Sequence, residues 1–242
     1  MNRTILAGLL ALSLLPATAA TAQTAPDYAA IVAAPDRGDA DHKLDTNRAP
    51  AQWLAFIGAK PGVTILDLFA VNGWKAELMA RAGAKVYAQN SEGGYARVKD
   101  KLEPRLKTPA GAGIVSVVRP LEDPAPAGMH DFDIVTFFYA YHDITYLGVD
   151  RPKMLKAVYE ALKPGGYFVM GDYSAKPGSG TSVVKTLHRS DEALVTGEIE
   201  AAGFKLVAHG DFLRHPEDTR ETHSHSSALP VDAYMLKFQK PN

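Results

Sequence analysis

The sequence contains no cysteine, and this absence excludes three kinds of site at once. A chain without thiols forms no disulfide, offers no thiolate to a metal and has no cysteine nucleophile. The absence suits an oxidising compartment without requiring one. Net charge is also close to zero, at a formal −1, and the sequence has no long basic run. We therefore expect neither nucleic acid nor an anionic membrane surface as a partner.

Long apolar runs are also missing, apart from one at the N-terminus. An apolar stretch over residues 5–15 follows a basic start and precedes an Ala-Thr-Ala pattern at residues 20–22. This order is typical of a cleaved secretory signal peptide, and the stretch is shorter than the roughly 20 residues of a membrane-spanning helix. The sequence thus predicts a signal peptide over residues 1–22. We expect a soluble periplasmic or secreted mature protein that begins near Gln23 and has no membrane partner after cleavage.

The rest of the chain alternates short apolar strands with amphipathic helices. We divide it into an N-terminal arm (residues 23–48) and one α/β domain (residues 49–242). The expected strands cover residues 64–68, 85–89, 114–118, 133–138, 167–172, 205–212 and 231–239. The expected helices cover residues 50–56, 73–82, about 94–102, 151–162 and 191–202, and a turn is expected at residues 163–166. This alternation predicts a largely parallel sheet covered on both faces, with an antiparallel pair of strands at one edge.

The first expected strand leads into a turn typical of nucleotide-binding folds. Asp67 lies near the end of that strand, a tight loop follows, and Gly73 begins an amphipathic helix. Such a strand–loop–helix unit is characteristic of Rossmann-type folds, whose ligands bind at the carboxyl ends of the strands. We therefore expect the strand ends to line one crevice, with contributions from Asp67, Gln89, Phe138 and Asp172.

Three long segments of the chain resemble one group of bacterial proteins. The segments ALKPGGYFVMGDYSAKPGSGT, TLHRSDEALVTGEIEAAGFKLVAHGDFLRHPED and DAYMLKFQKP are similar to exported proteins identified as class I methyltransferases dependent on S-adenosylmethionine (SAM). The N-terminal AAPDRGDADHKLDTNRAPAQWLAFIGAKPG and the central YHD segment also resemble that group. The resemblance implies a Rossmann-type three-layer sandwich with a mostly parallel seven-stranded sheet and an antiparallel last strand. It does not establish methyl transfer, because one fold hosts many reactions.

The chain departs from this resemblance where SAM would bind. The glycines of a D-x-G-x-G-x-G turn correspond to Phe69, Val71 and Gly73, so two side chains project toward the cofactor. The acidic residue that holds the ribose is replaced by amides. Export would also separate the protein from cytoplasmic SAM. We expect no cofactor, with a divergent but working SAM site as the alternative; the positions concerned are Asp67, Phe69, Val71, Asn72, Gly73, Gln89 and Asn90.

The main catalytic candidates directly follow the expected strand at residues 133–138. They are Tyr139, Tyr141, His142 and Asp143. His142 is suited to general acid–base catalysis near neutral pH, and Asp143 to orienting it. We expect this segment to be a crevice loop, so that replacing His142 leaves the fold nearly intact. The structural alternative is a histidine that caps the loop beside packed tyrosines.

A second group of candidates follows the next expected strand. Tyr173 is a phenol suited to donating to an oxyanion or stacking on an aromatic substrate, and His188 stands after a loop of lid-like composition. Arg189 is assigned either to an anionic substrate group or to an ion pair with Asp172 or Asp191. The expected substrate-binding residues are Trp74, Lys75, Asp172 and Arg189.

No metal site is predicted from the sequence. His142, Asp143 and His188 together contain suitable ligand atoms, yet no H-x-x-x-H or comparable spacing supports one. His215, His223 and His225 fall in a polar, turn-rich stretch. We expect a solvated loop there, with closure over the crevice as the alternative.

Two enzymatic hypotheses and one binding hypothesis follow. The favoured one is a SAM-independent enzyme that uses His142 and nearby tyrosines for acid–base elimination on a small aromatic or phenolic molecule. The second is SAM-dependent O- or N-methylation of such a molecule. The third is a periplasmic binding protein without turnover, which a Tyr-His-Asp cluster makes less attractive.

Overall fold

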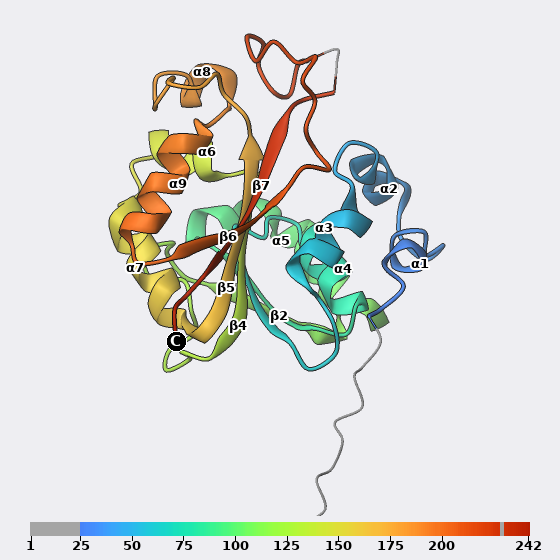
Figure 1. The fold of residues 1–242 in the computed structure, drawn as a ribbon. Helices are drawn as coiled ribbons and strands as arrows, with labels where there is room; N and C mark the ends of the chain where they lie inside the picture. Colours follow the sequence, from blue (N-terminus) through green and yellow to red (C-terminus); the bar gives the residue numbers. More distant parts are fainter. Residues whose placement is uncertain (1–24, 228–229) are drawn as a thin grey trace, which may run out of the picture.

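The computed structural model describes residues 25–227 and 230–242, so the predicted signal peptide lies outside the described part of the chain. The sheet has seven strands in the order β3-β2-β1-β4-β5-β7-β6 (Figure 1). Strands β1 to β5 pair in parallel, and β7 runs antiparallel to both of its neighbours, which confirms the predicted fold class. The strands are β1 (Thr64–Leu68), β2 (Lys85–Asn90), β3 (Ile114–Val118), β4 (Phe132–Phe138), β5 (Leu162–Tyr173), β6 (Lys205–Gly210) and β7 (Ala233–Gln239).

Helices cover both faces of the sheet and enclose two separate apolar cores. One core lies under α3 (Pro50–Ile57) and α4 (Trp74–Arg81), and the other under α7 (Arg151–Ala161) and α9 (Glu192–Ala201). Neighbouring residues of a central strand face opposite cores, as Ile65 and Leu66 do, and both are fully buried. This two-sided burial explains why the strands read as continuous apolar runs.

The N-terminal arm contains two helices that the sequence reasoning did not identify, α1 (Tyr28–Val32) and α2 (Asp39–Asp45). They lie beside α3 and α4 (Figure 1). The Trp74 indole donates a hydrogen bond to Asp45 at 3.0 Å, and Arg105 of α5 (Glu92–Leu106) pairs with Asp41. These contacts bring the end of the arm to the carboxyl ends of the strands.

The predicted turn at residues 163–166 belongs to β5 in the structure. Leu162 still pairs with Phe132 of β4, and a register shift follows between Phe132 and Ile134. Gly165 adopts a φ of +74° and donates a backbone hydrogen bond to Lys240 at 3.0 Å. The Pro-Gly-Gly sequence therefore produces an irregularity within a paired strand, because neighbouring strands supply the partners that an isolated turn lacks.

Other differences concern short elements that connect the strands. Three were not predicted: α6 (Tyr141–Tyr146), α8 (Val184–Leu187) and the 3₁₀ helix η1 (Pro109–Gly113). Elements of one or two turns are too short for a sequence period to identify. Among the described residues, no helix combines the length and the apolar character needed to cross a membrane.

Candidate active site at the carboxyl ends of the strands

The turn after β1 keeps the backbone of a glycine-rich loop without the glycines. Phe69 and Val71 have φ angles of +52° and +53°, in the left-handed region that costs an L-residue roughly 1–2 kcal/mol. Gly73 has a φ of +80°, and a Cβ there would lie 2.8 Å from Leu102. A side chain at the third position would force Leu102 to shift and would add strain in the left-handed region, so glycine is favoured there. The two lost glycines are replaced at a cost in backbone strain.

The amides of Gln89 and Asn90 bond to this turn. Gln89 Oε1 accepts from the Phe69 backbone N–H at 3.0 Å, and Asn90 Oδ1 accepts from that of Val71 at 2.9 Å. Gln89 also donates to the Arg119 carbonyl at 2.6 Å, and Asn90 to the Val71 carbonyl at 3.2 Å. Both amides occupy the place expected of a ribose-binding acid, and both are already bonded to the protein itself.

Lys75 and Asp67 form a buried pair beneath the same turn. Lys75 Nζ donates to the Phe69 carbonyl at 3.2 Å and lies 3.9 Å from Asp67 Oδ2. Burial raises the pKa of Asp67 and lowers that of Lys75, and their mutual attraction opposes both shifts. Lys75 was expected to bind substrate; it lines the cavity beside the turn, while its ammonium group contacts the Phe69 carbonyl and Asp67.

A cavity of about 350 Å³ borders the turn, lined by residues that include Val71, Trp74, Arg97 and Tyr139. The backbone N–H groups of residues 69 and 71 and the side-chain amides of Gln89 and Asn90 are bonded within the protein, so in this conformation they offer no donor to a cofactor. Trp74 lines this cavity as expected, although it is only 3% exposed.

His142 lies on the first turn of α6, where its imidazole is held by Asp172 at the end of β5. Its Nδ1 is 2.7 Å from Asp172 Oδ1, and its backbone N–H donates to Oδ2 at 2.8 Å. A carboxylate only accepts hydrogen bonds, so Nδ1 carries the proton and Nε2 is left as the basic atom. Burial lowers the pKa of His142, but the Asp172 carboxylate outweighs it and the pKa lies above its ordinary value.

Two expectations about this pair are corrected by the structure. His142 is 1% exposed and belongs to helix α6, so it does not lie on a crevice loop as expected. Because its side chain is buried, a His142 substitution is expected to disturb the fold, contrary to the prediction of a nearly intact fold. Asp172 was expected to bind substrate. It is fully buried and also accepts from Tyr173 N at 2.9 Å and Ser190 Oγ at 2.7 Å, which makes it the residue that orients His142, a role expected of Asp143.

Asp143 and His188 face the free nitrogen of His142. Asp143 Oδ1 lies 3.4 Å from His142 Nε2 and 3.5 Å from His188 Nδ1. Within the described residues, both of these nitrogens are buried without a hydrogen-bond partner. Burial, together with the charges of His142 and His223, lowers the pKa of His188 despite Asp143, so its imidazole favours the neutral form.

Two further histidines complete what we call the histidine cluster, defined as His142, Asp143, His188, His223 and His225. The ring of His223 lies 4.5 Å from that of His188, and the ring of His225 lies 5.6 Å from it. His225 is exposed, as expected for a solvated loop, and it also lines the crevice, with its ring 5.8 Å from that of Tyr173. His215 instead lies beside Glu217, with its Nδ1 3.3 Å from that carboxylate.

Arg189 anchors this loop from within the fold. It is fully buried, pairs with Asp218 at 2.8 and 3.2 Å, and donates to the Thr222 carbonyl at 2.9 Å. The expectation that it holds a substrate anion, or pairs with Asp172 or Asp191, is therefore wrong. Its partner lies 29 residues away along the chain, which no local pattern indicates.

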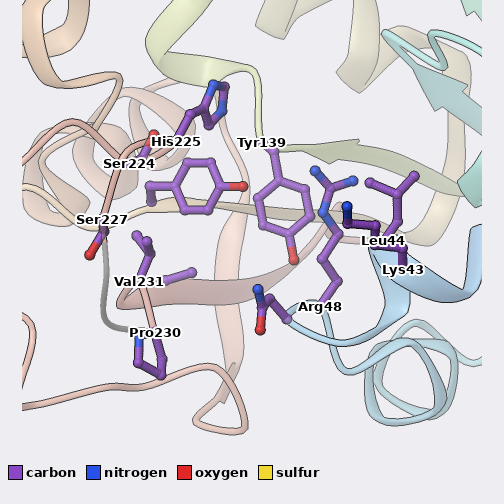
Figure 2. A pocket seen from close by; sticks show the side chains of 12 residues that line it. Lys43, Leu44, Arg48, Tyr139, Ser224, His225, Ser227, Pro230 and Val231 are labelled. Carbon is purple, nitrogen blue, oxygen red and sulfur yellow. The ribbon is translucent and has the colours of Figure 1, made fainter. Parts of the chain in front are cut away.

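The crevice beside the cluster is a pocket of about 530 Å³. Tyr139 and Tyr173 line it, together with Lys43 and Arg48 of the arm and His225 of the loop. Figure 2 shows Tyr139 beside Arg48, with His225 and Pro230 on the opposite side. Burial raises the pKa of both tyrosines, so their phenols stay protonated as donors. Sequence reasoning missed Lys43 and Arg48, because nothing in the arm indicates that it reaches the strand ends.

Arg48 is held by aromatic rings in this crevice. Its guanidinium carbon lies 5.1 Å from the Tyr139 ring and 5.3 Å from the Trp74 ring. Both distances are within the range of cation–π attraction. His142 lies deeper in the protein than the residues that line the pocket. It is 1% exposed, and its ring is 6.2 Å from that of Tyr173, which lines the pocket.

Tyr141 points away from the group in which the sequence reasoning placed it. Its hydroxyl bonds to Glu198 of α9, which Arg151 of α7 also holds at 2.7 and 3.0 Å. Its ring packs against Phe137 in the core under these helices. A one-residue step from Tyr141 to His142 along a helix rotates the side chain by about 100°, which sends the two to different places.

Comparisons with known proteins agree with the fold. Residues 66–170 match the family described as Methyltransferase domain. The chain is 23% identical over 185 residues to a ubiquinone/menaquinone biosynthesis C-methyltransferase, UbiE, of Klebsiella pneumoniae, covering 73% of this chain and 68% of that protein.

Two solved structures illustrate the likeness in three dimensions. A SAM-dependent methyltransferase from Aquifex aeolicus superposes with a TM-score of 0.59 at 16% identity, covering 84% of this chain and all of that one. The [4+2]-cyclase SpnF superposes with a TM-score of 0.62 at 15% identity, covering 86% of this chain and 85% of that one. At such low identity these superpositions establish the fold alone.

Proposed function

We propose that this chain, a member of the class I SAM-dependent methyltransferase-like family, is an enzyme that performs acid–base elimination on a small aromatic anion without using SAM. One observation carries the proposal. The backbone N–H groups of Phe69 and Val71 are bonded to Gln89 and Asn90, so the turn that would receive the cofactor is closed by the protein's own side chains. The description of SpnF as a [4+2]-cyclase supports the idea that this fold hosts other chemistry.

The lining of the crevice supports an anionic aromatic substrate. Lys43 and Arg48 bring positive charge to a pocket that two tyrosine rings also line. Protonated phenols and a guanidinium together can hold a carboxylate or phenolate while the rings stack on an aromatic ring. This feature sharpens the substrate class, which the sequence suggested from its aromatic residues alone.

The histidine cluster would supply the proton transfer. His142 Nε2 is basic and fixed in direction by Asp172, and it is buried, with the His142 ring 6.2 Å from that of Tyr173. His225 is exposed, and the described residues from 211 to 227 form neither helix nor strand, so a small displacement of this segment would open Nε2 to the crevice. In an elimination, the imidazole would take a proton from the carbon next to the one that bears an oxygen leaving group. The C=C bond would form as the bond to that oxygen breaks, and a phenol of Tyr139 or Tyr173 would give its proton to the departing oxygen.

Calorimetric titration with SAM and S-adenosylhomocysteine tests the first half of the proposal. We expect no binding in the low micromolar range. Thermal-shift screening against phenolic and aromatic carboxylates tests the second half, because a ligand that binds the folded state raises the melting temperature. Micromolar SAM binding would restore methyl transfer as the function.

SAM-dependent O- or N-methylation is the second candidate. The cavity of about 350 Å³ beside the turn favours it, because this space adjoins the place where the family binds its cofactor. A binding protein without turnover is the third, and a tight ligand that is recovered chemically unchanged after long incubation would favour it.

Export is a separate part of the proposal and rests on the sequence of residues 1–22. A periplasmic or secreted location would place the protein away from cytoplasmic SAM. N-terminal sequencing of fractionated cells should find Gln23 or a close neighbour as the first residue outside the cytoplasm. An intact Met1 in the cytoplasmic fraction would exclude cleavage.

A further inference from the structure

We infer that His142, Asp143 and His188 form a binding site for one divalent transition-metal ion of the zinc type. The inference concerns the same cluster as the proposed function. Binding of the metal ion does not depend on the proposed function, but any part the ion plays in the elimination reaction does. The three ligand atoms all lie within 4.8 Å of one another.

The separations of these atoms match a metal centre. Zinc bonds to nitrogen and oxygen at about 2.0–2.1 Å with tetrahedral angles, which puts neighbouring ligand atoms about 3.3–3.4 Å apart. Asp143 Oδ1 lies 3.4 Å from His142 Nε2 and 3.5 Å from His188 Nδ1. A small inward movement of His188 would complete the geometry.

The two nitrogens are also left unsatisfied in a way that favours an ion. Both are buried, and within the described chain neither makes a hydrogen bond. Burying a polar atom without a partner costs free energy, so native structures rarely leave two beside one carboxylate. Asp143 Oδ1 accepts a hydrogen bond from the Tyr146 hydroxyl at 2.9 Å, and a carboxylate oxygen has a second lone pair for an ion. An ion between the three atoms would satisfy both nitrogens and neutralise the Asp143 charge.

The surroundings of His142 are those of a metal-bound histidine. Its other nitrogen bonds to the Asp172 carboxylate at 2.7 Å, the arrangement that fixes the tautomer and direction of a ligating imidazole. Asp172 is in turn held by Ser190 Oγ, which contacts the Tyr234 hydroxyl at 2.7 Å. This buried chain of bonds leaves Nε2 with one direction in which to bind.

Three protein ligands leave a fourth position for water or substrate, as in catalytic zinc sites. The rings of His223 and His225 lie 4.5 and 5.6 Å from that of His188, so they border the cluster. A phenolate or carboxylate that enters from the crevice would find the open position. A metal there would also lower the pKa of a bound water, which would then take the role of base while His142 Nε2 stays a ligand.

The site is tested by measuring zinc binding to the purified full chain. The protein carries no polyhistidine tag and is first treated with a chelator to remove bound metal. Calorimetry should find one equivalent of Zn²⁺ per chain. His188→Ala and Asp143→Asn should each weaken binding by more than about 100-fold, because loss of an outer partner alone costs about 10–100-fold. Asp172→Asn should fall in that lower range. His209→Ala, whose side chain is 52% exposed and lies outside the cluster, should bind as wild type does.

Two further measurements keep the result clear. Circular dichroism establishes that each variant is folded, and His188 is the safer position because its side chain is 24% exposed while that of His142 is 1%. Co²⁺ in place of zinc should give the visible absorption of a four-coordinate ion in wild type and lose it in His188→Ala.

A folded wild type that binds zinc more weakly than about 100 μM overturns the inference, as does equal binding by His188→Ala and Asp143→Asn. The proposed function fails differently. If zinc does not bind but Asp172→Asn abolishes turnover, the acid–base proposal stands without a metal. If zinc binds but SAM also binds at micromolar concentration, the metal site stands and the SAM-independent reaction does not.

Discussion

The turn after β1 and the histidine cluster after β4 and β5 lie at the same edge of one sheet, yet their polar groups are bonded differently. The exception is Asp67 Oδ2 beneath the turn, which is also buried without a hydrogen bond among the described residues. In the turn, Gln89 and Asn90 bond to the backbone of Phe69 and Val71. In the cluster, nitrogens of His142 and His188 remain buried without a hydrogen bond among the described residues. Fully bonded polar groups stabilise a fold, whereas unsatisfied ones are available to a ligand.

The ion pair of Lys75 with Asp67 and the hydrogen-bonded pair of His142 with Asp172 also differ in whether they leave a polar atom free. Lys75 turns its ammonium group toward Asp67 and the Phe69 carbonyl, so both charges are used within the turn. Asp172 instead holds one nitrogen of His142 and thereby leaves the other free and aligned. This difference is the structural basis on which the proposed function assigns proton transfer to the side of β4 and β5 and not to the turn after β1.

Substitution in the cluster should have the largest effect on turnover. His142→Ala is expected to lower the rate on the substrate found by screening by roughly 10²–10⁴-fold, since this is the usual contribution of an acid–base group. Steady-state kinetics with circular dichroism measure this. Because His142 is buried, Asp172→Asn serves as a second variant that keeps the size of the side chain and loses its charge. A folded His142→Ala protein within about threefold of wild type would contradict the assignment.

Substitution of the loop anchor should have the largest effect on stability. Arg189→Met leaves Asp218 buried without its partner, and breaking such a pair costs about 3–5 kcal/mol. Urea denaturation measures this loss. Turnover should also fall, because Arg189 holds the segment that carries His223 and His225. As a control, Lys176→Met removes an exposed pair with Glu221 and should change stability little.

The contribution of this anchor should depend on pH with a defined sign. Burial raises the pKa of Asp218, but the bonds from Arg189 and from backbone N–H groups outweigh it, and the pKa lies below its ordinary 3.8. A depressed carboxyl pKa stabilises the folded state above the unfolded value, and this stabilisation is lost as pH falls through the folded value. The stability difference between wild type and Arg189→Met should therefore narrow below about pH 4. A constant difference down to pH 2 would exclude this account.

Substitution of Tyr141 should affect stability, whereas substitution of Tyr173 should affect kcat. Tyr141→Phe removes a hydroxyl bonded to Glu198, so it should cost about 1–2 kcal/mol of stability and leave kcat unchanged. Tyr173→Phe removes a hydroxyl in the crevice, so it should lower kcat with little loss of stability. Kinetics and denaturation of both variants provide the comparison. A drop in kcat for Tyr141→Phe alone would reverse the placement.

Restoring a glycine in the turn should have the smallest effect. Val71 is 39% exposed with a φ of +53°, so Val71→Gly relieves backbone strain at little cost in packing, and stability should rise by up to about 1 kcal/mol. SAM binding should remain undetectable, because Asn90 still bonds to the backbone of residue 71. Thermal denaturation and calorimetry measure the two quantities. Low-micromolar SAM binding by this variant would show that the side chain alone had closed the site.

Much of the fold follows from patterns within short windows of sequence. The alternation of apolar strands and amphipathic helices predicted a parallel sheet with an antiparallel edge, and the strands β1 and β3 have the predicted bounds. The substitutions at Phe69 and Val71 were also visible as departures from a glycine-rich turn. Such features depend on residues a few positions apart, where periodicity and turn preference act.

The site was predicted less completely, because its contacts join distant parts of the chain. His142 and Tyr173 were predicted as site residues because they lie at or just after the carboxyl ends of strands: Tyr173 ends β5, and His142 lies four residues after β4. The partner of His142 was misassigned to the neighbouring Asp143, although Asp172 lies 30 residues further on. Arg48 was missed because the position of the arm depends on bonds such as that from Trp74 to Asp45.

The sequence by itself thus determined the sheet, its two buried faces and the loss of glycines where a cofactor would bind, since each is a local matter of side-chain pattern and backbone preference. Only the tertiary structure decided that the amides of β2 bond to that turn and that Arg189 holds the segment around Asp218 and Thr222. It also decided that ligand atoms of His142, Asp143 and His188 lie within 4.8 Å of one another. These arrangements depend on the direction of side chains from loops that are far apart in sequence, and that direction is set by packing and not by any spacing along the chain.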